Sequence, residues 1–326
     1  MRKIIKTLLG IGGAFCLIGA LLFSIGFTSG GTKYVHDTNL NSMNAQEDNK
    51  ESANRFTLKK TEIPDFTSLN INLEDSDLNI EESPNEKSYI EYAQATKDKK
   101  NPVSYSIENG TLTLKEAGNT GASYYINVDI SFLQAALSSK NIEDYTKESS
   151  KYENYDNLNL PKEKLVYSAK IYLGYGDFYV KNATFDTTNI KLDDGDFDAN
   201  TLTANSGKLT FSYGDCDLQK ASLGNISLTS KDGDLTVNEL TLSGKTKIAL
   251  SYGDAEITLN DSTKKVSGFD LATHYGTITA SGLNGNKTLD EDDDVNTFQS
   301  DSKDGKTKLS IDSKDGDITV KYSDRF

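Results

Sequence analysis

Tryptophan is absent from the 326 residues, and cysteine and histidine occur only twice each. Cys216 is the only cysteine beyond residue 30, so the larger part of the chain cannot form an internal disulfide. The two histidines, His36 and His274, stand far apart and lie outside any metal-ligating or nucleophilic motif. The sequence also lacks G-x-S-x-G, HExxH and a phosphate-binding glycine loop. These absences argue against the common hydrolase, zinc peptidase and nucleotide-dependent enzyme classes.

Basic residues are in deficit, with 35 Lys and Arg against 49 Asp and Glu, which gives a net charge of −14. An acidic surface repels the phosphates of nucleic acids and of anionic lipids, so nucleic-acid binding is excluded. The apolar content of 36% and the 25 glycines suit short strands and turns better than a thick helical core.

Only one long hydrophobic run is present, from residue 7 to residue 27, and it follows Arg2, Lys3 and Lys6. A helix of about 20 apolar residues spans the roughly 30 Å of a bilayer core, and a basic flank stays cytoplasmic. We therefore predict a single-pass anchor at residues 1–29 and a C-terminal domain outside the membrane of a Gram-positive bacterium. A cleaved signal peptide, with Ser24 or Gly26 near the cleavage site, is the alternative.

Residues 30–55 are polar and aperiodic, which predicts a flexible tether. Beyond them a motif recurs every 19 residues, as "IYLGYGDFYV", "IKLDDGDFDA", "LTFSYGDCDL" and "LTSKDGDLTV", with a fifth copy around Gly253. Apolar residues stand two apart, the strand period. The position five residues before the glycine is apolar in every copy: Ile171, Ile190, Leu209, Leu228 and Ile248.

Short strands with one apolar face cannot form a self-sufficient unit, but stacked copies bury a continuous core. We predict an all-β fold, a parallel β-solenoid of about 19 residues per coil over residues 56–326, with each glycine at a corner that needs positive φ. An antiparallel β-sandwich is the alternative. Weaker copies start at Ile71, Tyr105, Leu271 and Ile311. An insertion at about 131–164 and an acidic loop at about 284–306 interrupt the pattern.

The stretch "NLPKEKLVYSAKIYLGYGDFYVKN" and the repeated Gly-Asp corners resemble the "putative-adhesin" β-strand repeat family of unknown function. Leu160-Pro161-Lys162 and the corners carry the match, which covers roughly residues 56–326. Its members resemble LiaG-type proteins found beside envelope-stress response genes in Gram-positive bacteria. The resemblance implies a membrane-attached solenoid without known catalytic residues.

Two rows of polar residues flank the glycines and are the candidate sites. The first row supplies oxygen ligands of the kind that suit weak Ca²⁺ binding, the only cofactor we predict: Asp177, Asp196, Asp215, Asp234 and Asp254. In the second row tyrosine and aspartate alternate, which either relieves charge repulsion or forms a functional edge. The tyrosines of this predicted binding edge are Tyr175, Tyr213, Tyr252 and Tyr275.

The function predicted from these features is a non-catalytic interaction module in the cell envelope, acting in the envelope-stress response with an envelope protein as partner. The alternative is an adhesin or cell-wall glycan-binding protein that stacks sugars on the tyrosines. A polysaccharide-cleaving enzyme is a weaker hypothesis, because catalytic carboxylates need different environments and the five aspartates look equivalent.

Overall fold

The computed structural model describes residues 54–83, 87–96, 100–117, 121–130, 168–263, 267–290, 295–303 and 305–323. Every element within these ranges is a β-strand. The predicted anchor, nearly all of the predicted tether and the predicted insertion lie outside them. Within the described ranges, the structure contains no helix with the length and apolar character of a membrane span.

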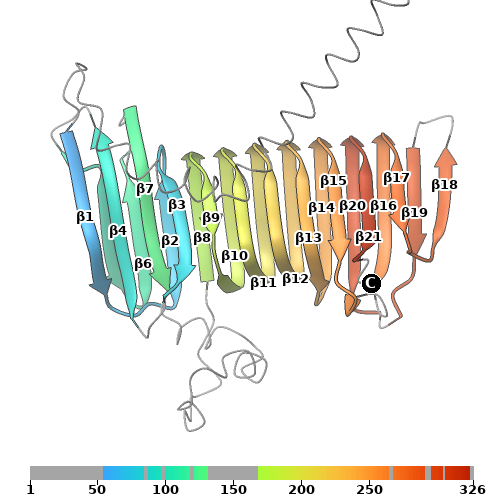
Figure 1. Ribbon diagram of the computed structural model, residues 1–326, viewed down its shortest axis with the longest axis horizontal. Coiled ribbons are helices and arrows are strands. Elements are labelled where there is room, and N and C mark those ends of the chain that lie inside the picture. Colours follow the sequence, from blue (N-terminus) through green and yellow to red (C-terminus); the bar gives the residue numbers. More distant parts are fainter. Residues whose placement is uncertain are drawn as a thin grey trace, which may run out of the picture. The chain divides into compact units, whose positions relative to one another are not determined.

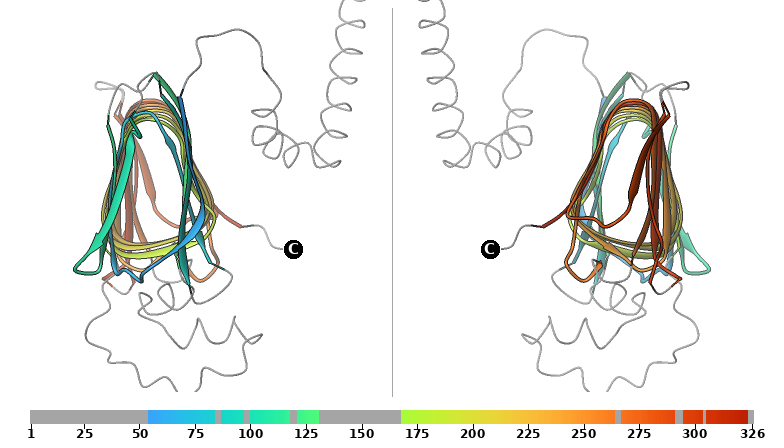
Figure 2. Two further views of the ribbon diagram at one scale, coloured as in Figure 1. Left: turned by 90° about the vertical axis from the view of Figure 1, so that its left-hand side faces the viewer. Right: turned by 90° about the vertical axis from the view of Figure 1, so that its right-hand side faces the viewer.

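The centre of the domain is a stack of parallel strands, each about one repeat further along the chain. It contains β8 (Ser168–Tyr175), β10 (Ala183–Asp194), β11 (Phe197–Tyr213), β12 (Cys216–Asp232) and β14 (Lys245–Tyr252). Figure 1 shows these strands side by side, and in the end-on views of Figure 2 the coils superpose. Ile190 pairs with both Ile171 and Leu209, and Leu228 pairs with both Leu209 and Ile248. The predicted apolar column and the parallel register are therefore confirmed.

A second run of strands follows the glycine corners and closes the other side of the core. It contains β9 (Phe178–Val180), the first residues of β11 and β12, β13 (Leu235–Leu242) and β15 (Ala255–Leu259). Phe178 stacks on Phe197 with ring centroids 5.0 Å apart, and Phe197 stacks on Phe211 at 5.6 Å. The equal coil length brings equivalent side chains together, so the interior is a ladder of apolar residues.

The last two coils are stacked in the reverse of their order in the sequence. β20 (Lys308–Asp315) pairs with β14 on one side and with β16 (Gly268–Tyr275) on the other. Likewise β21 (Ile318–Tyr322) lies between β15 and β17 (Ile278–Ser281). The C-terminal coil is thus inserted between two coils that precede it, as Figure 1 shows.

Antiparallel strands flank the stack at its N-terminal end. β2 (Ser68–Leu73) and β3 (Asp77–Glu82) join the parallel stack through β8 and β9. Beyond them β1 (Asn54–Ile63), β4 (Ser88–Thr96) and β7 (Gly121–Ile130) pair antiparallel.

The copy predicted as a coil at Tyr105 is instead a hairpin of β5 (Val103–Glu108) and β6 (Thr111–Glu116). Its turn, Asn109-Gly110, has positive φ at both residues, as a tight hairpin turn requires.

The segment predicted as an acidic loop at 284–306 also contains a hairpin. β18 (Asn286–Asp290) pairs antiparallel with β19 (Val295–Ser300), and β19 pairs antiparallel with β16. Phe298 is buried against the core, which explains why strands form in a segment of acidic composition. The loop prediction is corrected for these residues.

Candidate functional site

Most of the described coils turn at a glycine whose positive φ other residues could adopt only with strain, although Ser76 stands at the corner between β2 and β3 and Gly276 has no positive φ. Gly195, Gly214 and Gly233 have φ values of 134°, 115° and 130°. A Cβ on Gly214 would lie 2.2 Å from the carbonyl oxygen of Gly195 in the neighbouring coil. The glycines are thus needed both for their conformation and for the close approach of successive coils.

The aspartate after the corner residue, which is glycine in every coil but that of Ser76, links each coil to the next. Its Oδ1 accepts a hydrogen bond from the backbone N–H of the equivalent residue in the following coil, at donor–acceptor distances from 2.7 to 3.0 Å. We call this row the aspartate ladder, and its members are Asp77, Asp177, Asp196, Asp215, Asp234, Asp254 and Asp317. Sequence reasoning missed this role, although an aspartate after each repeated glycine was its signal.

All five aspartates predicted to bind Ca²⁺ belong to the ladder, and the Oδ1 of each accepts a backbone hydrogen bond. Among the residues that the structure describes, no group of three or more His, Cys, Asp and Glu side chains is arranged to hold a metal ion. Weak Ca²⁺ binding at these carboxylates therefore stays a prediction.

The ladder produces a crowded acidic corner. Burial, and then the charge of Asp217 together with charges in the ladder, raises the pKa of Asp198 above its usual value. Desolvation, with a smaller contribution from the charge of Asp177, likewise raises the pKa of Asp77, although the backbone hydrogen bond opposes this shift. Burial is thus the main cause of both shifts, and the neighbouring carboxylates add to it.

The residue before each glycine forms a second row, in which tyrosine and aspartate alternate through the stack. In spatial order we call this row the tyrosine–aspartate edge, and its members are Tyr175, Asp194, Tyr213, Asp232, Tyr252, Asp315 and Tyr275. Along the sequence the alternation fails, because Tyr275 follows Tyr252. The inserted C-terminal coil places Asp315 between them and restores it.

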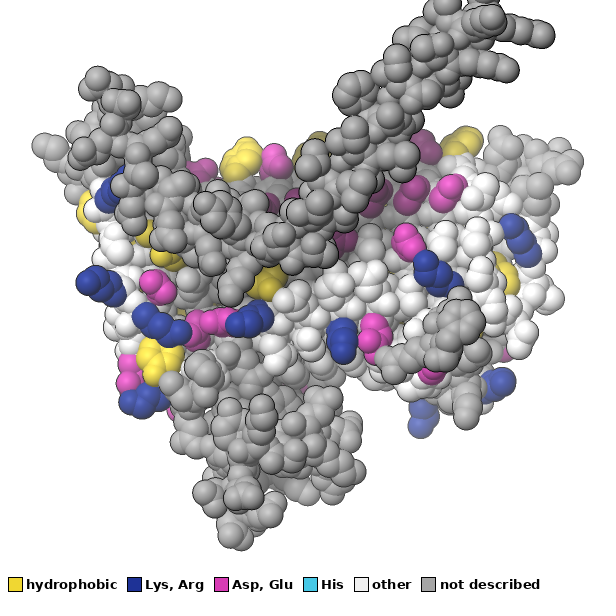
Figure 3. Space-filling view, in the orientation of Figure 1, with side chains coloured by type: hydrophobic (Ala, Val, Ile, Leu, Met, Phe, Trp, Pro, Cys, Tyr) yellow, Lys and Arg dark blue, Asp and Glu magenta, His cyan; other side chains and the backbone are white. Residues whose placement is uncertain are grey.

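The four predicted edge tyrosines are all strongly exposed. Their relative accessibilities are 64% for Tyr175, 56% for Tyr213, 61% for Tyr252 and 65% for Tyr275. Figure 3 shows hydrophobic and acidic side chains alternating along the upper margin of the molecule, where the corners lie. The structure thus brings all four into one line.

Charge relief explains a neutral residue between the acids but does not explain the aromatic ring. Two carboxylates about 5 Å apart repel by roughly 0.8 kcal/mol in water, and spacing them two coils apart weakens this repulsion. Serine or asparagine would serve equally well at the neutral positions. Tyrosine instead exposes a large apolar ring in every one of them, which creates a row of flat contact surfaces.

One face of the sheet beside the edge carries a polar cluster. The hydroxyl of Tyr172 donates a hydrogen bond to Oδ2 of Asp193 at 2.8 Å, and Lys191 forms an ion pair with Asp193 at 2.6 Å. The bond to Asp193 raises the pKa of Tyr172 to about 12. Lys191 in turn lowers the pKa of Asp193. These groups satisfy one another and stabilise the face.

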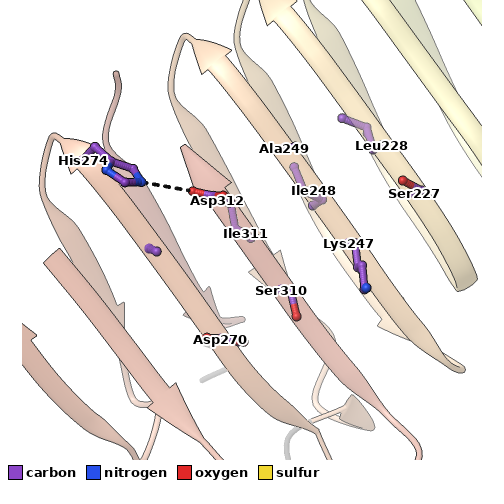
Figure 4. A pocket seen from close by; sticks show the side chains of 11 residues that line it. Ser227, Leu228, Lys247, Ile248, Ala249, Asp270, His274, Ser310, Ile311 and Asp312 are labelled. Carbon is purple, nitrogen blue, oxygen red and sulfur yellow. Dashed lines mark ion pairs between the residues drawn. The ribbon is translucent and has the colours of Figure 1, made fainter. Parts of the chain in front are cut away.

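His274 lines an open hollow across β12, β14, β20 and β16, drawn in Figure 4. Small outward residues such as Ala249 and Ser310 leave the space. His274 Nε2 points toward Asp312 Oδ1 at 3.7 Å, and Asp270 is paired with Lys308 at 3.1 Å.

Cys216 lies apart from this hollow. It faces the interior four coils away from His274, and burial raises the pKa of its thiol. The described residues therefore bring no histidine to Cys216.

Comparison with solved structures finds distant likenesses. A "putative adhesin" from Bacteroides fragilis is 14% identical with a TM-score of 0.44, covering 84% of this chain and 98% of its own. A "putative cell adhesion protein" from Clostridium sporogenes is 13% identical with a TM-score of 0.36, covering 84% and 100%. A "putative lipid binding protein" from Parabacteroides distasonis is 13% identical with a TM-score of 0.35, covering 83% and 97%. No curated protein matches the sequence.

A family model gives the firmer result, because it matches most of the chain. The model for Toastrack DUF4097 matches residues 66–321, which include the corners, the aspartate ladder and the tyrosine–aspartate edge. With the β-solenoid architecture described above, this match establishes that the chain belongs to the Toastrack DUF4097 family.

Proposed function

We propose that this protein is a non-catalytic interaction module of the cell envelope, and that it contacts an envelope protein through the tyrosine–aspartate edge. The alternation of exposed tyrosines and aspartates, complete in spatial order although broken in sequence order, is the observation that carries the proposal. A repeated solenoid corner offers a long and regular line of contact, which suits an extended partner better than a small molecule.

The cellular setting is part of the same proposal. Residues 7–27 and their basic flank support a membrane anchor with the solenoid outside. A flexible tether of about 25 residues would give an r.m.s. reach of roughly 25–30 Å, which keeps the domain near the bilayer. The resemblance to LiaG-type proteins supports a role in the envelope-stress response.

An adhesin or wall-glycan-binding function is the second candidate. The exposed rings of the edge favour it, because aromatic side chains stack on the apolar faces of sugars. The acidity of the edge weighs against it, because a neutral glycan has no positive charge to pair with the carboxylates and anionic wall polymers are repelled.

Photo-crosslinking in living cells tests the choice. The full-length chain carries a photo-reactive residue in place of Tyr213, and a control chain carries it in place of Tyr105, an exposed tyrosine on β5 away from the edge. We expect the Tyr213 position to capture a membrane protein that the Tyr105 position does not. Capture of wall glycan alone would favour the second candidate, and identical capture from both positions would reject the edge as the contact surface.

A further inference from the structure

The edge tyrosines set a fixed spacing along the solenoid. Successive tyrosines lie two coils apart, with one aspartate-bearing coil between them. Parallel strands are separated by about 4.8 Å, so the tyrosines recur about every 9.6 Å. The row from Tyr175 to Tyr275 contains three such intervals and is therefore about 29 Å long.

The charge around this row has one dominant sign. Asp194, Asp232 and Asp315 lie between the tyrosines, and the aspartate ladder runs beside them. The basic residues next to the row in sequence, among those that the structure describes, are two lysines, Lys231 and Lys314, and one histidine, His274. Because the ladder carboxylates are held by backbone donors, they form a preorganised acidic line. A partner that matches this line must carry positive charge at the same interval.

The interval distinguishes between backbone conformations of such a partner. Side chains on one face of a β-strand recur about every 6.7 Å, which does not match. The seven-residue repeat of an α-helix is about 10.5 Å, so it falls out of step by about 3 Å over three intervals. Three residues of a polyproline II helix rise about 9.3 Å and return to the same side, with an error of about 1 Å over the whole row.

We propose that the partner segment on the tyrosine–aspartate edge is a basic, proline-rich stretch in the polyproline II conformation, with Lys or Arg recurring at every third position. Prolyl rings pack on the exposed tyrosines, the way in which aromatic surfaces recognise such helices. The basic side chains lie between the rings and reach the carboxylates. This inference rests on the proposed function and names the chemistry of the partner.

A register-controlled peptide titration tests the inference on the full-length protein in nanodiscs. The probe is a labelled peptide of four Pro-Pro-Lys triplets, and the control has the same eight prolines and four lysines in irregular order. Fluorescence anisotropy should show binding of the regular peptide at least about tenfold tighter than that of the control. Raised salt should weaken it, because exposed charges are screened.

Variants assign the contacts. Tyr213→Asn with Tyr252→Asn should weaken binding at least about tenfold, while Tyr105→Asn leaves it unchanged. Asp232→Asn should weaken binding several-fold and flatten its salt dependence.

Three results would overturn the inference. Equal binding of the two peptides would show that the interval is irrelevant. No binding of the regular peptide, while the photo-reactive residue at Tyr213 still captures a membrane protein, would reject this chemistry and leave the proposed function standing. Binding of soluble peptidoglycan fragments that is lost with Tyr213→Asn and Tyr252→Asn but unchanged by Asp232→Asn would identify a glycan as the ligand instead.

Discussion

Substitution of a corner glycine measures how tightly the coils are stacked. In Gly214→Ala the new Cβ would lie 2.2 Å from the carbonyl oxygen of Gly195 and 2.7 Å from its carbon. A contact with backbone cannot be relieved by a side-chain rotation, so the coil must move by roughly 1 Å, which exceeds what close-packed interiors absorb. That shift stretches the bond from the Asp215 N–H to Oδ1 of Asp196, now 2.9 Å.

The expected magnitude follows from two contributions. A φ of 115° is strongly unfavourable for alanine, at about 1–3 kcal/mol. Loss of one or two interstrand hydrogen bonds adds about 1 kcal/mol each. Gly214→Ala should therefore lower the free energy of unfolding by about 2–5 kcal/mol.

Two other glycines separate these contributions. Gly224 has no positive φ, but its Cβ would lie 2.1 Å from the oxygen of Asn205, so Gly224→Ala introduces the clash alone. Gly305 has a φ of 66° and no atom within 4 Å of its Cβ, so Gly305→Ala introduces only backbone strain of about 1 kcal/mol.

Urea unfolding of the full-length protein in detergent, followed by circular dichroism, measures all three variants. We expect Gly214→Ala to be the least stable and Gly305→Ala the most stable. A Gly214→Ala protein as stable as Gly305→Ala would refute the close stacking of coils.

The other predictions concern the core, the acidic corner and the topology. Leu209→Asp places an unpaired charge in the buried column and should cost more than about 4 kcal/mol in urea unfolding; near-normal stability would contradict the stack. The pKa of Asp198 is raised in the folded state, so the folded protein loses stability as the pH rises through the usual pKa of aspartate toward the raised value. Protonation of Asp198 at low pH removes this cost. Asp198→Asn should thus raise the melting temperature near pH 7 but not near pH 3, where an equal gain would disprove this cause. Protease added to wall-stripped cells should digest the chain beyond residue 55, and complete protection would reject the proposed topology.

The repeat allowed the fold to be predicted because stacked coils must have equal length. The apolar column through Leu209 and the glycine corners both follow from that requirement, and both are present. The equal coil length does not predict the order of the last two coils, because an apolar strand of this repeat can pair with any other coil of the column. The broken alternation of Tyr252, Tyr275 and Asp315 was the one signal of the insertion.

The ends of the stack were harder to predict than its centre. Asn109-Gly110 is a strong hairpin signal, but the surrounding residues also fit the coil pattern. The candidate edge was predicted from the alternation of tyrosine and aspartate before the glycines. The hydrogen bonds from the backbone to the ladder aspartates were not predicted, because they depend on the distance between stacked coils. A sequence repeat does not show which side chain reaches the next coil.

Replacement of the tyrosine rings without any change in charge shows whether the tyrosine–aspartate edge is the contact surface. Tyr213→Asn with Tyr252→Asn keeps neutral residues between the acids, so charge relief is retained and the melting temperature should stay the same. A photo-reactive residue in place of the exposed Lys231, beside the edge, reports the contact in living cells. We expect this position to capture a membrane protein in the otherwise unchanged chain and to lose that capture in the double variant. Undiminished capture by the double variant would contradict the claim that the tyrosine–aspartate edge is the contact surface.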